Sequence, residues 1–120
     1  MMLNISSEAA GIGAGVLIRA AEPLTGIETM RRRRRVENIH QLASGPGRLT
    51  QAFGIDLSLD GTLYGEGNPL WLADDGSRAP RIARSMRIGI TRNAERPWRY
   101  FVRGPWVSGP VRLNNPPARD

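Results

Sequence analysis

The 120-residue sequence contains no cysteine, no lysine and a single histidine. The absence of cysteine excludes disulfide bonds, thiolate metal sites and a cysteine nucleophile. The lone histidine, His40, cannot form a multi-histidine metal site. One histidine is also too little to argue for a Ser/His/Asp catalytic arrangement. We therefore expect neither a metal nor a cofactor.

Long apolar runs and targeting signals are also missing. No apolar stretch approaches the ~20 residues needed to span a bilayer. The first residues, MMLNISSEAAG, lack the basic and apolar regions of a secretory signal. The sequence therefore predicts a cytoplasmic protein with no membrane partner. Its 40% apolar and 23% charged residues are typical of a soluble domain with one modest core.

All 17 basic residues are arginine, and their position is informative. Nine arginines lie between Arg78 and Arg112 against one acid, Glu95, whereas the first 60 residues are nearly neutral. Such a block suits a polyanion, because each neutralised phosphate releases condensed counterions. A solvated surface on a protein encoded by a GC-rich genome is the alternative. Charge alone does not separate DNA, RNA and a membrane surface.

The first third of the chain predicts strands and a helix. Residues 2–7 are expected to be a strand end, and residues 15–20 (GVLIRA) a strand buried on both faces. Arg19 interrupts this strand and needs a partner or a ligand there. Thr25 and Glu28 then read as a capping box for a helix that runs to about Arg35. The arginines at 31–35 either complement the helix dipole or contact phosphate.

The remaining chain predicts shorter elements. Residues 38–43 are expected to form a helical turn, and residues 48–53 a helix that follows Pro46 and ends at Gly54. Residues 56–77 are expected to be irregular. Residues 86–91 and 98–103 are expected to be strands joined by a hairpin at 92–97, and residues 109–120 a disordered tail. The fold class is α+β.

Six segments resemble, in order, the alkyladenine (3-methyladenine) DNA glycosylase family. They are LNISS from residue 3, GVLIRAAEPL from 15, GIETMR from 26, SGPGRLTQA from 44, RIGI from 87 and YFVRGPWVS from 100. The resemblance implies that residues 1–108 are the C-terminal part of a single glycosylase domain. It implies an N-terminally truncated α+β fold, built on a curved antiparallel β-sheet or roll with a few flanking helices.

The resemblance also implies an activity. The family flips a damaged purine out of double-stranded DNA and hydrolyses its N-glycosidic bond with an activated water. It therefore implies a monofunctional, monomeric DNA-3-methyladenine glycosylase of base-excision repair, located at the nucleoid of a bacterium.

Five residues take roles by this resemblance. Arg19 and the backbone carbonyl of Ile88 would position the water, with Arg19 donating to the water or to an adjacent phosphate, and Asn4 would line the base pocket. Gly89 and Arg48 would meet the DNA backbone. Without the resemblance, Arg19 could pair with Glu22 or Glu28, and Gly89 could mark a strand bulge.

The positions at which the sequence departs from the family are as informative as the matches. The family's catalytic glutamate, base-stacking aromatics, pocket histidine and wedge tyrosine all lie upstream of the segment that matches residue 3. Glu8 and Glu22 occupy other family positions, and Leu57 stands where the family has a DNA-contacting lysine. We therefore expect this chain to be a fragment that is inactive alone. The alternatives are a non-catalytic nucleic-acid-binding module, or an RNA- or protein-binding module that shares only the fold.

Overall fold

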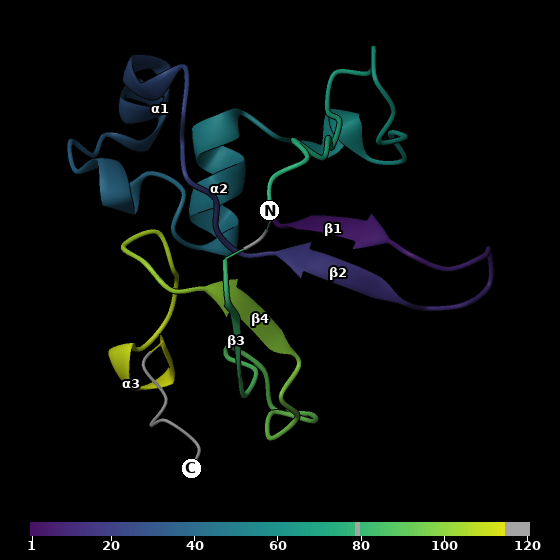
Figure 1. The fold of residues 1–120 in the computed structure, drawn as a ribbon. Helices are drawn as coiled ribbons and strands as arrows, with labels where there is room; N and C mark the ends of the chain where they lie inside the picture. Colours follow the sequence, from purple (N-terminus) through teal and green to yellow (C-terminus); the bar gives the residue numbers. More distant parts are fainter. Residues whose placement is uncertain (79, 115–120) are drawn as a thin grey trace.

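The computed structural model describes residues 1–78 and 80–114, and it confirms the α+β class. Helices α1 and α2 lie side by side, and two β-hairpins extend away from them in different directions (Figure 1). In chain order the elements are β1 (Leu3–Ser6), β2 (Gly15–Ile18), α1 (Ile27–Arg34), the 3-10 turn η1 (Ile39–Gln41), α2 (Pro46–Phe53), the 3-10 turn η2 (Leu57–Leu59), β3 (Ile82–Ser85), β4 (Arg99–Val102) and α3 (Val111–Asn114).

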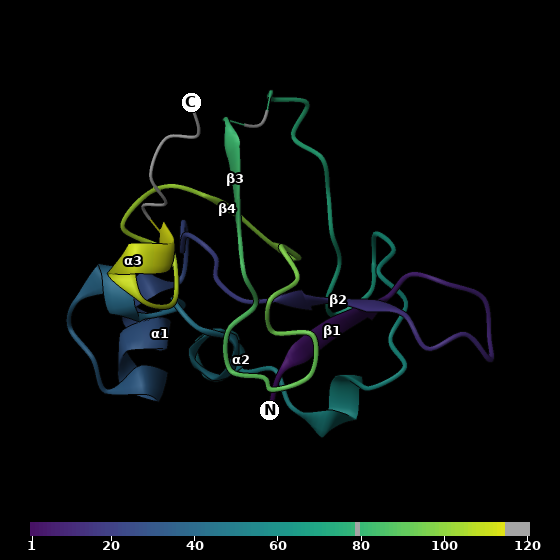
Figure 2. The ribbon, with the colours of Figure 1, turned by 90° about the horizontal axis from the view of Figure 1, so that it is seen from below.

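The strands form two separate antiparallel pairs. In the first hairpin Leu3 of β1 faces Ile18 of β2, and in the second Ile82 of β3 faces Val102 of β4. The turned view separates the two hairpins clearly (Figure 2). A continuous curved sheet or roll stays a prediction, because β1–β2 and β3–β4 are not hydrogen-bonded to each other within the described residues.

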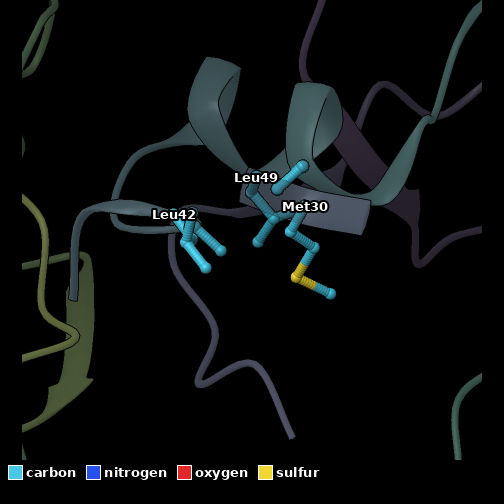
Figure 3. Packing of buried hydrophobic residues seen from close by; sticks show 5 residues of the cluster. Met30, Leu42 and Leu49 are labelled. Atoms are coloured by element: carbon cyan, nitrogen blue, oxygen red, sulfur yellow. The ribbon is translucent and has the colours of Figure 1, made fainter. Parts of the chain in front are cut away.

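The hydrophobic core lies between α1, the segment after η1, and α2. Its buried members are Met30, Leu42, Ala43, Leu49 and Ala52 (Figure 3). Leu42 is fully buried, and the small Ala52 lets α2 approach α1 closely. The first hairpin packs on this core through Leu3 and Ile18. The cluster contains no residue of β3 or β4, so the second hairpin is held in place by other contacts.

The arginines of α1 mostly serve the fold. Arg31 forms an ion pair with Glu28, Arg33 Nη1 donates to the Ala52 carbonyl at 3.0 Å, and Arg34 Nε donates to the Leu42 carbonyl at 3.1 Å. These bonds tie the last turn of α1 to α2 and to the core. The expected capping box is wrong, because the N-cap is Gly26 with no side-chain cap, and Glu28 turns to Arg31 instead.

Helix α2 follows its sequence signals. Pro46 stands at its first turn, where the missing N–H costs no hydrogen bond. Gly54 ends it in the left-handed conformation (φ 67°) and donates its N–H to the Gln51 carbonyl at 3.3 Å. The expected helical turn at 38–43 is also present, as η1.

Two expected strands differ from the structure. Strand β2 ends at Ile18 and Val16 is 53% exposed, so residues 15–20 are not buried on both faces. Helices cover one face of this two-stranded sheet, and its other face is exposed to solvent. Residues 86–91 are not a strand: β3 lies earlier, at Ile82–Ser85. The backbone then bends, because Gly89 and Asn93 take positive φ values of 76° and 53°.

Within the expected disordered tail, Val111–Asn114 form the helical turn α3, and residues 115–120 lie outside the described residues. The domain boundary at residue 108 stays a prediction. In the part of the chain that the structure describes, every helix is too short or too polar to cross a membrane.

Candidate functional site

A groove of about 970 Å³ is lined by both hairpins and by the chain that follows β4. Three of the five residues predicted for the site line it: Asn4 from β1, Arg19 just after β2, and Ile88 from the turn between β3 and β4. The rest of the lining comes from residues 15–22, 98–103 and 106–108, together with Arg87 and Ile90. The structure therefore brings the predicted water-positioning and base-pocket residues to one place.

The groove carries an excess of positive charge. Four arginines line it against one carboxylate, Glu22, and their positions are 19, 87, 99 and 103. Glu22 is exposed. None of the ion pairs formed among the described residues includes any of these four arginines. Their charge is therefore not neutralised by protein carboxylates and is available to an anionic ligand.

Arg19 is half-buried and carries an unsatisfied donor among the described residues. Its Nε is buried without a hydrogen-bond partner within residues 1–78 and 80–114. Burial lowers the pKa of its guanidinium. The structural alternative of an Arg19–Glu28 pair is not formed, because Glu28 pairs with Arg31. A buried donor on a charged group costs on the order of 1–3 kcal/mol or more when it is unsatisfied, so this position favours a ligand.

Sequence reasoning missed Arg99, which is 4% exposed at the start of β4. Its Nη1 donates to Ser85 Oγ at 2.8 Å, and its Nη2 donates to the Ser108 carbonyl and to Asn114 Oδ1, both at 2.5 Å. Its guanidinium lies 4.3 Å from the centre of the Phe101 ring. Burial lowers the pKa of Arg99, and the nearby charge of Arg19 lowers it further.

The strand period alone does not identify Arg99, because alternation in WRYFVR could equally bury Trp98, Tyr100 and Val102. In a strand alternate residues share a face, so Arg99 lies with the half-buried Phe101, and Tyr100 lies with the exposed Val102 on the opposite face. Arg99 is thus the arginine of WRYFVR that points inward with an aromatic residue. Charge alone does not distinguish Arg99 from the other eight arginines of the basic block.

Aromatic side chains accompany these arginines. Arg87 and Arg96 lie over the ring of Trp98, at 5.7 Å and 5.5 Å, and Arg84 lies 5.0 Å over Tyr100. Interleaved arginine and aromatic groups offer both charge and stacking planes, a combination that nucleic-acid-binding surfaces use.

A fourth aromatic side chain, Trp106, lines the groove and packs against His40 with ring centres 4.5 Å apart. The only histidine in the sequence therefore supports the wall of the groove from behind rather than lining it.

The turn that carries Ile88 is supported from the chain after β4. A Cβ placed on Gly109 (φ 100°) would lie 2.5 Å from Ile88 Cδ1, so this glycine leaves room for the isoleucine side chain. The neighbouring Gly89 has φ 76° and open space around it. Because Gly89 lies in this turn and not in a strand, the strand-bulge alternative is wrong.

Asn4 lines the groove, whereas Arg48 lies outside it. Asn4 pairs with Leu17 across the first hairpin, and its carbonyl accepts a hydrogen bond from Tyr64 Oη at 3.1 Å. Arg48 is exposed on the first turn of α2, where its Nη1 donates to Ser44 Oγ at 3.5 Å. Neither Arg48 nor Gly89 lines the groove, so both would act outside it.

Comparisons with known proteins identify a family. The family model "Methylpurine-DNA glycosylase (MPG)" matches residues 1–105. Curated relatives include proteins named "Putative 3-methyladenine DNA glycosylase" from Mesorhizobium japonicum, 59% identical over 114 residues, and from Rubrobacter xylanophilus, 44% identical over 111 residues. These matches cover 94% and 92% of this chain but 55% and 57% of the relatives. The chain thus spans about half the length of the curated relatives it matches.

Proposed function

This chain belongs to the methylpurine-DNA glycosylase family, and we propose that it contributes the water-positioning, DNA-facing part of a DNA-3-methyladenine glycosylase of base-excision repair. One observation carries the proposal: Asn4, Arg19 and Ile88, which take site roles by the family resemblance, line the same arginine-rich groove. The substrate would be double-stranded DNA that contains an alkylated or deaminated purine.

The chemistry requires a water next to the sugar of a flipped nucleotide. A base inside the duplex is out of reach, so the damaged purine must leave the stack, and a weakly paired lesion does so more easily. As the N-glycosidic bond breaks, positive charge develops on the sugar and water adds to it. Arg19 would donate a hydrogen bond to that water, and the Ile88 carbonyl would accept one from it. Fixing the water in this way lowers the entropy cost of the reaction.

The other site residues would orient the nucleic acid. The amide of Asn4 would crowd the exocyclic amine of a normal guanine and so favour damaged purines. Gly89, with open space around it, would let the turn approach the backbone closely. Arg48 would contact a phosphate from the first turn of α2.

A general base that matches the family's glutamate is missing from the groove among residues 1–78 and 80–114. Among the groove residues only Glu22 carries a carboxylate, and it does not match the family's catalytic glutamate. We therefore propose that the polypeptide of residues 1–120 binds DNA but does not excise bases by itself. A monofunctional hydrolytic activity would belong to a protein that combines this groove with a glutamate from another segment.

DNA binding by this polypeptide should be weak, independent of sequence and steeply dependent on salt. If three or four phosphates are neutralised, a plot of log K against log salt has a slope of about −2.7 to −3.6. Fluorescence anisotropy with a labelled duplex between 50 and 200 mM salt, conditions typical for such plots, measures this slope. An affinity that does not change with salt would contradict the proposal.

Two variants test whether the salt dependence of DNA binding arises from the arginines of the groove. Arg87→Met removes a groove charge and should reduce the slope by about one unit. Arg32→Met removes an exposed charge on α1, away from the groove lining, and should leave the slope unchanged. Equal effects of the two variants would show that binding is spread over the whole basic surface.

A further inference from the structure

We propose that the outer face of the β3–β4 hairpin is a stacking platform for unpaired bases of single-stranded DNA. The platform consists of the rings of Trp98 and Tyr100 and the guanidinium groups of Arg84, Arg87 and Arg96. It goes beyond the proposed function, because the groove is proposed to take a duplex. It rests on that function only for the nucleic acid being DNA.

Strand alternation places the two rings on the same side of the hairpin. Arg99, which lies between them in the sequence, is buried and donates to Ser85 on the inner side, so Trp98 and Tyr100 are directed outward. Both rings are open, because Trp98 is 54% exposed and Tyr100 is 59% exposed. Alternate residues of a strand lie about 7 Å apart, so each ring has room for a base of its own.

Arg84 connects the two rings across the hairpin. It lies opposite Tyr100 in the strand register, and its guanidinium is 5.0 Å from the centre of that ring. Its Nε and Nη2 donate to the carbonyl of Pro97, the neighbour of Trp98, at 3.3 and 3.2 Å. Among the described residues its Nη1 has no acceptor, so two N–H groups remain for a phosphate.

The charge of the hairpin favours a polyanion over an apolar protein surface. Residues 82–103 contain six arginines and one acid, Glu95, so their net charge is +5. Glu95 pairs with Arg96 at 3.7 Å, but both side chains are exposed, so the pair is weak. An apolar partner would remove Arg84 and Arg87 from water without supplying an anion, which costs free energy. The phosphates of a nucleic-acid strand would neutralise them.

Exposed aromatic rings select unpaired bases over a duplex. In duplex DNA each base is stacked between its neighbours, ~3.4 Å apart along the strand, so its ring faces are covered. An unpaired base can place its ring on an aromatic side chain, and such stacking tolerates any sequence because every base has a π-face. The wider spacing of Trp98 and Tyr100 suits bases that are not stacked on each other.

Titration with labelled oligodeoxythymidine, which remains single-stranded, tests the platform by fluorescence anisotropy. Tyr100→Leu removes the ring and keeps an apolar side chain, and it should weaken binding by about fivefold or more. Tyr100→Phe keeps the ring and should bind within about twofold of the unsubstituted chain. Trp71→Leu removes an exposed tryptophan outside the platform and should leave the affinity unchanged. Full affinity in Tyr100→Leu, or an equal loss in Tyr100→Phe, would overturn the proposal.

Two further variants test the platform independently of Tyr100. Trp98→Leu should weaken binding by a similar factor, because it removes the second stacking ring. Arg84→Met should reduce the slope of log K against log salt by about 0.7, the contribution of one phosphate on a single strand. An unchanged affinity in Trp98→Leu, or an unchanged slope in Arg84→Met, would contradict the platform.

Parallel titrations separate the platform from the duplex groove. Tyr100→Leu should leave duplex affinity within about twofold, because paired bases do not reach the ring. Equal losses for the duplex and for oligodeoxythymidine would overturn the platform. If duplex binding is independent of salt while Tyr100→Leu still weakens oligodeoxythymidine binding, the proposed function fails and the platform stands. Binding of oligouridylate without binding of oligodeoxythymidine would overturn the assignment to DNA.

A second copy of this chain is the alternative occupant of this face, because the exposed apolar side chains of Ile82 and Val102 lie on it as well. Sedimentation velocity of the chain without DNA tests this alternative, and we expect a monomer. A dimer that Tyr100→Leu dissociates would show that the face is an interface between copies and would overturn the proposal.

Discussion

Incubated with duplex DNA that contains 3-methyladenine or hypoxanthine, the polypeptide of residues 1–120 is expected to release no free base above a buffer control. General-base catalysis typically contributes 10²–10⁴ in rate. Among the residues that line the groove, only Glu22 carries a carboxylate, and it is exposed. Arg19 and Ile88 can position a water but cannot accept its proton. Chromatography of the released bases, after incubation with excess polypeptide, measures the effect.

A Glu22→Gln variant provides the matched control. If the unsubstituted chain releases base and Glu22→Gln does not, then Glu22 is the general base and the absence of activity proposed above is wrong. Release that survives Glu22→Gln would require another base and would contradict the account as well. A longer, active glycosylase in the same assay shows that the substrate is competent.

Replacing Arg99 should cause the largest loss of stability among the groove residues. Arg99→Leu removes a buried cation and leaves Ser85, Ser108 and Asn114 without the donor they share. Hydrogen bonds to charged groups contribute about 1.5–3 kcal/mol each, although not additively, so we expect a loss of at least ~3 kcal/mol. Urea unfolding followed by tryptophan fluorescence measures this difference in the free energy of unfolding.

Arg84→Leu is the control for Arg99→Leu. Arg84 lies on β3 of the same hairpin and is exposed, and among the described residues it donates only to the Pro97 carbonyl, at 3.3 and 3.2 Å. Its removal should cost less than about 1 kcal/mol. Similar losses in both variants would show that Arg99 does not hold the second hairpin to the chain after β4.

The elements predicted correctly from sequence have strong local signals. Helix α2 has Pro46 at its start and Gly54 at its end, and both act within one turn of the helix. Strand β4 is rich in residues that favour strands, and it forms near the expected place. Such signals depend on residues that are close in the sequence, so the helix and the strand can be predicted without the tertiary structure.

The errors came from contacts that local sequence does not contain. Thr25 and Glu28 have the spacing of a capping box, but Arg31 competes for the carboxylate one turn later. Apolar and polar residues alternate over 86–91 as in a strand, yet β4 pairs with the four residues before them. In that register Ser85 lies opposite Arg99. That register buries Arg99 next to its acceptor and leaves residues 86–91 to form the turn.

Only part of the candidate site can be predicted from the sequence. Arg19 stood out because a charge interrupts an apolar run, and Asn4 and Ile88 acquired meaning only through the family resemblance. The structure adds that these three residues line one groove with Arg99. Arg99 gave little signal, because it is one of nine arginines in a basic block. Its burial depends on partners 9 to 15 residues away in the sequence.

The central claim is that the groove is the DNA-facing surface, and the three tryptophans test it directly. Trp98 and Trp106 line the groove, whereas Trp71 lies in the irregular segment outside it. Indole N–H signals of ¹⁵N-labelled protein, assigned by single Trp→Phe replacements, are followed while duplex DNA is added. The account predicts shifts for Trp98 and Trp106 and none for Trp71. Shifts confined to Trp71, with DNA shown to be bound, would contradict it.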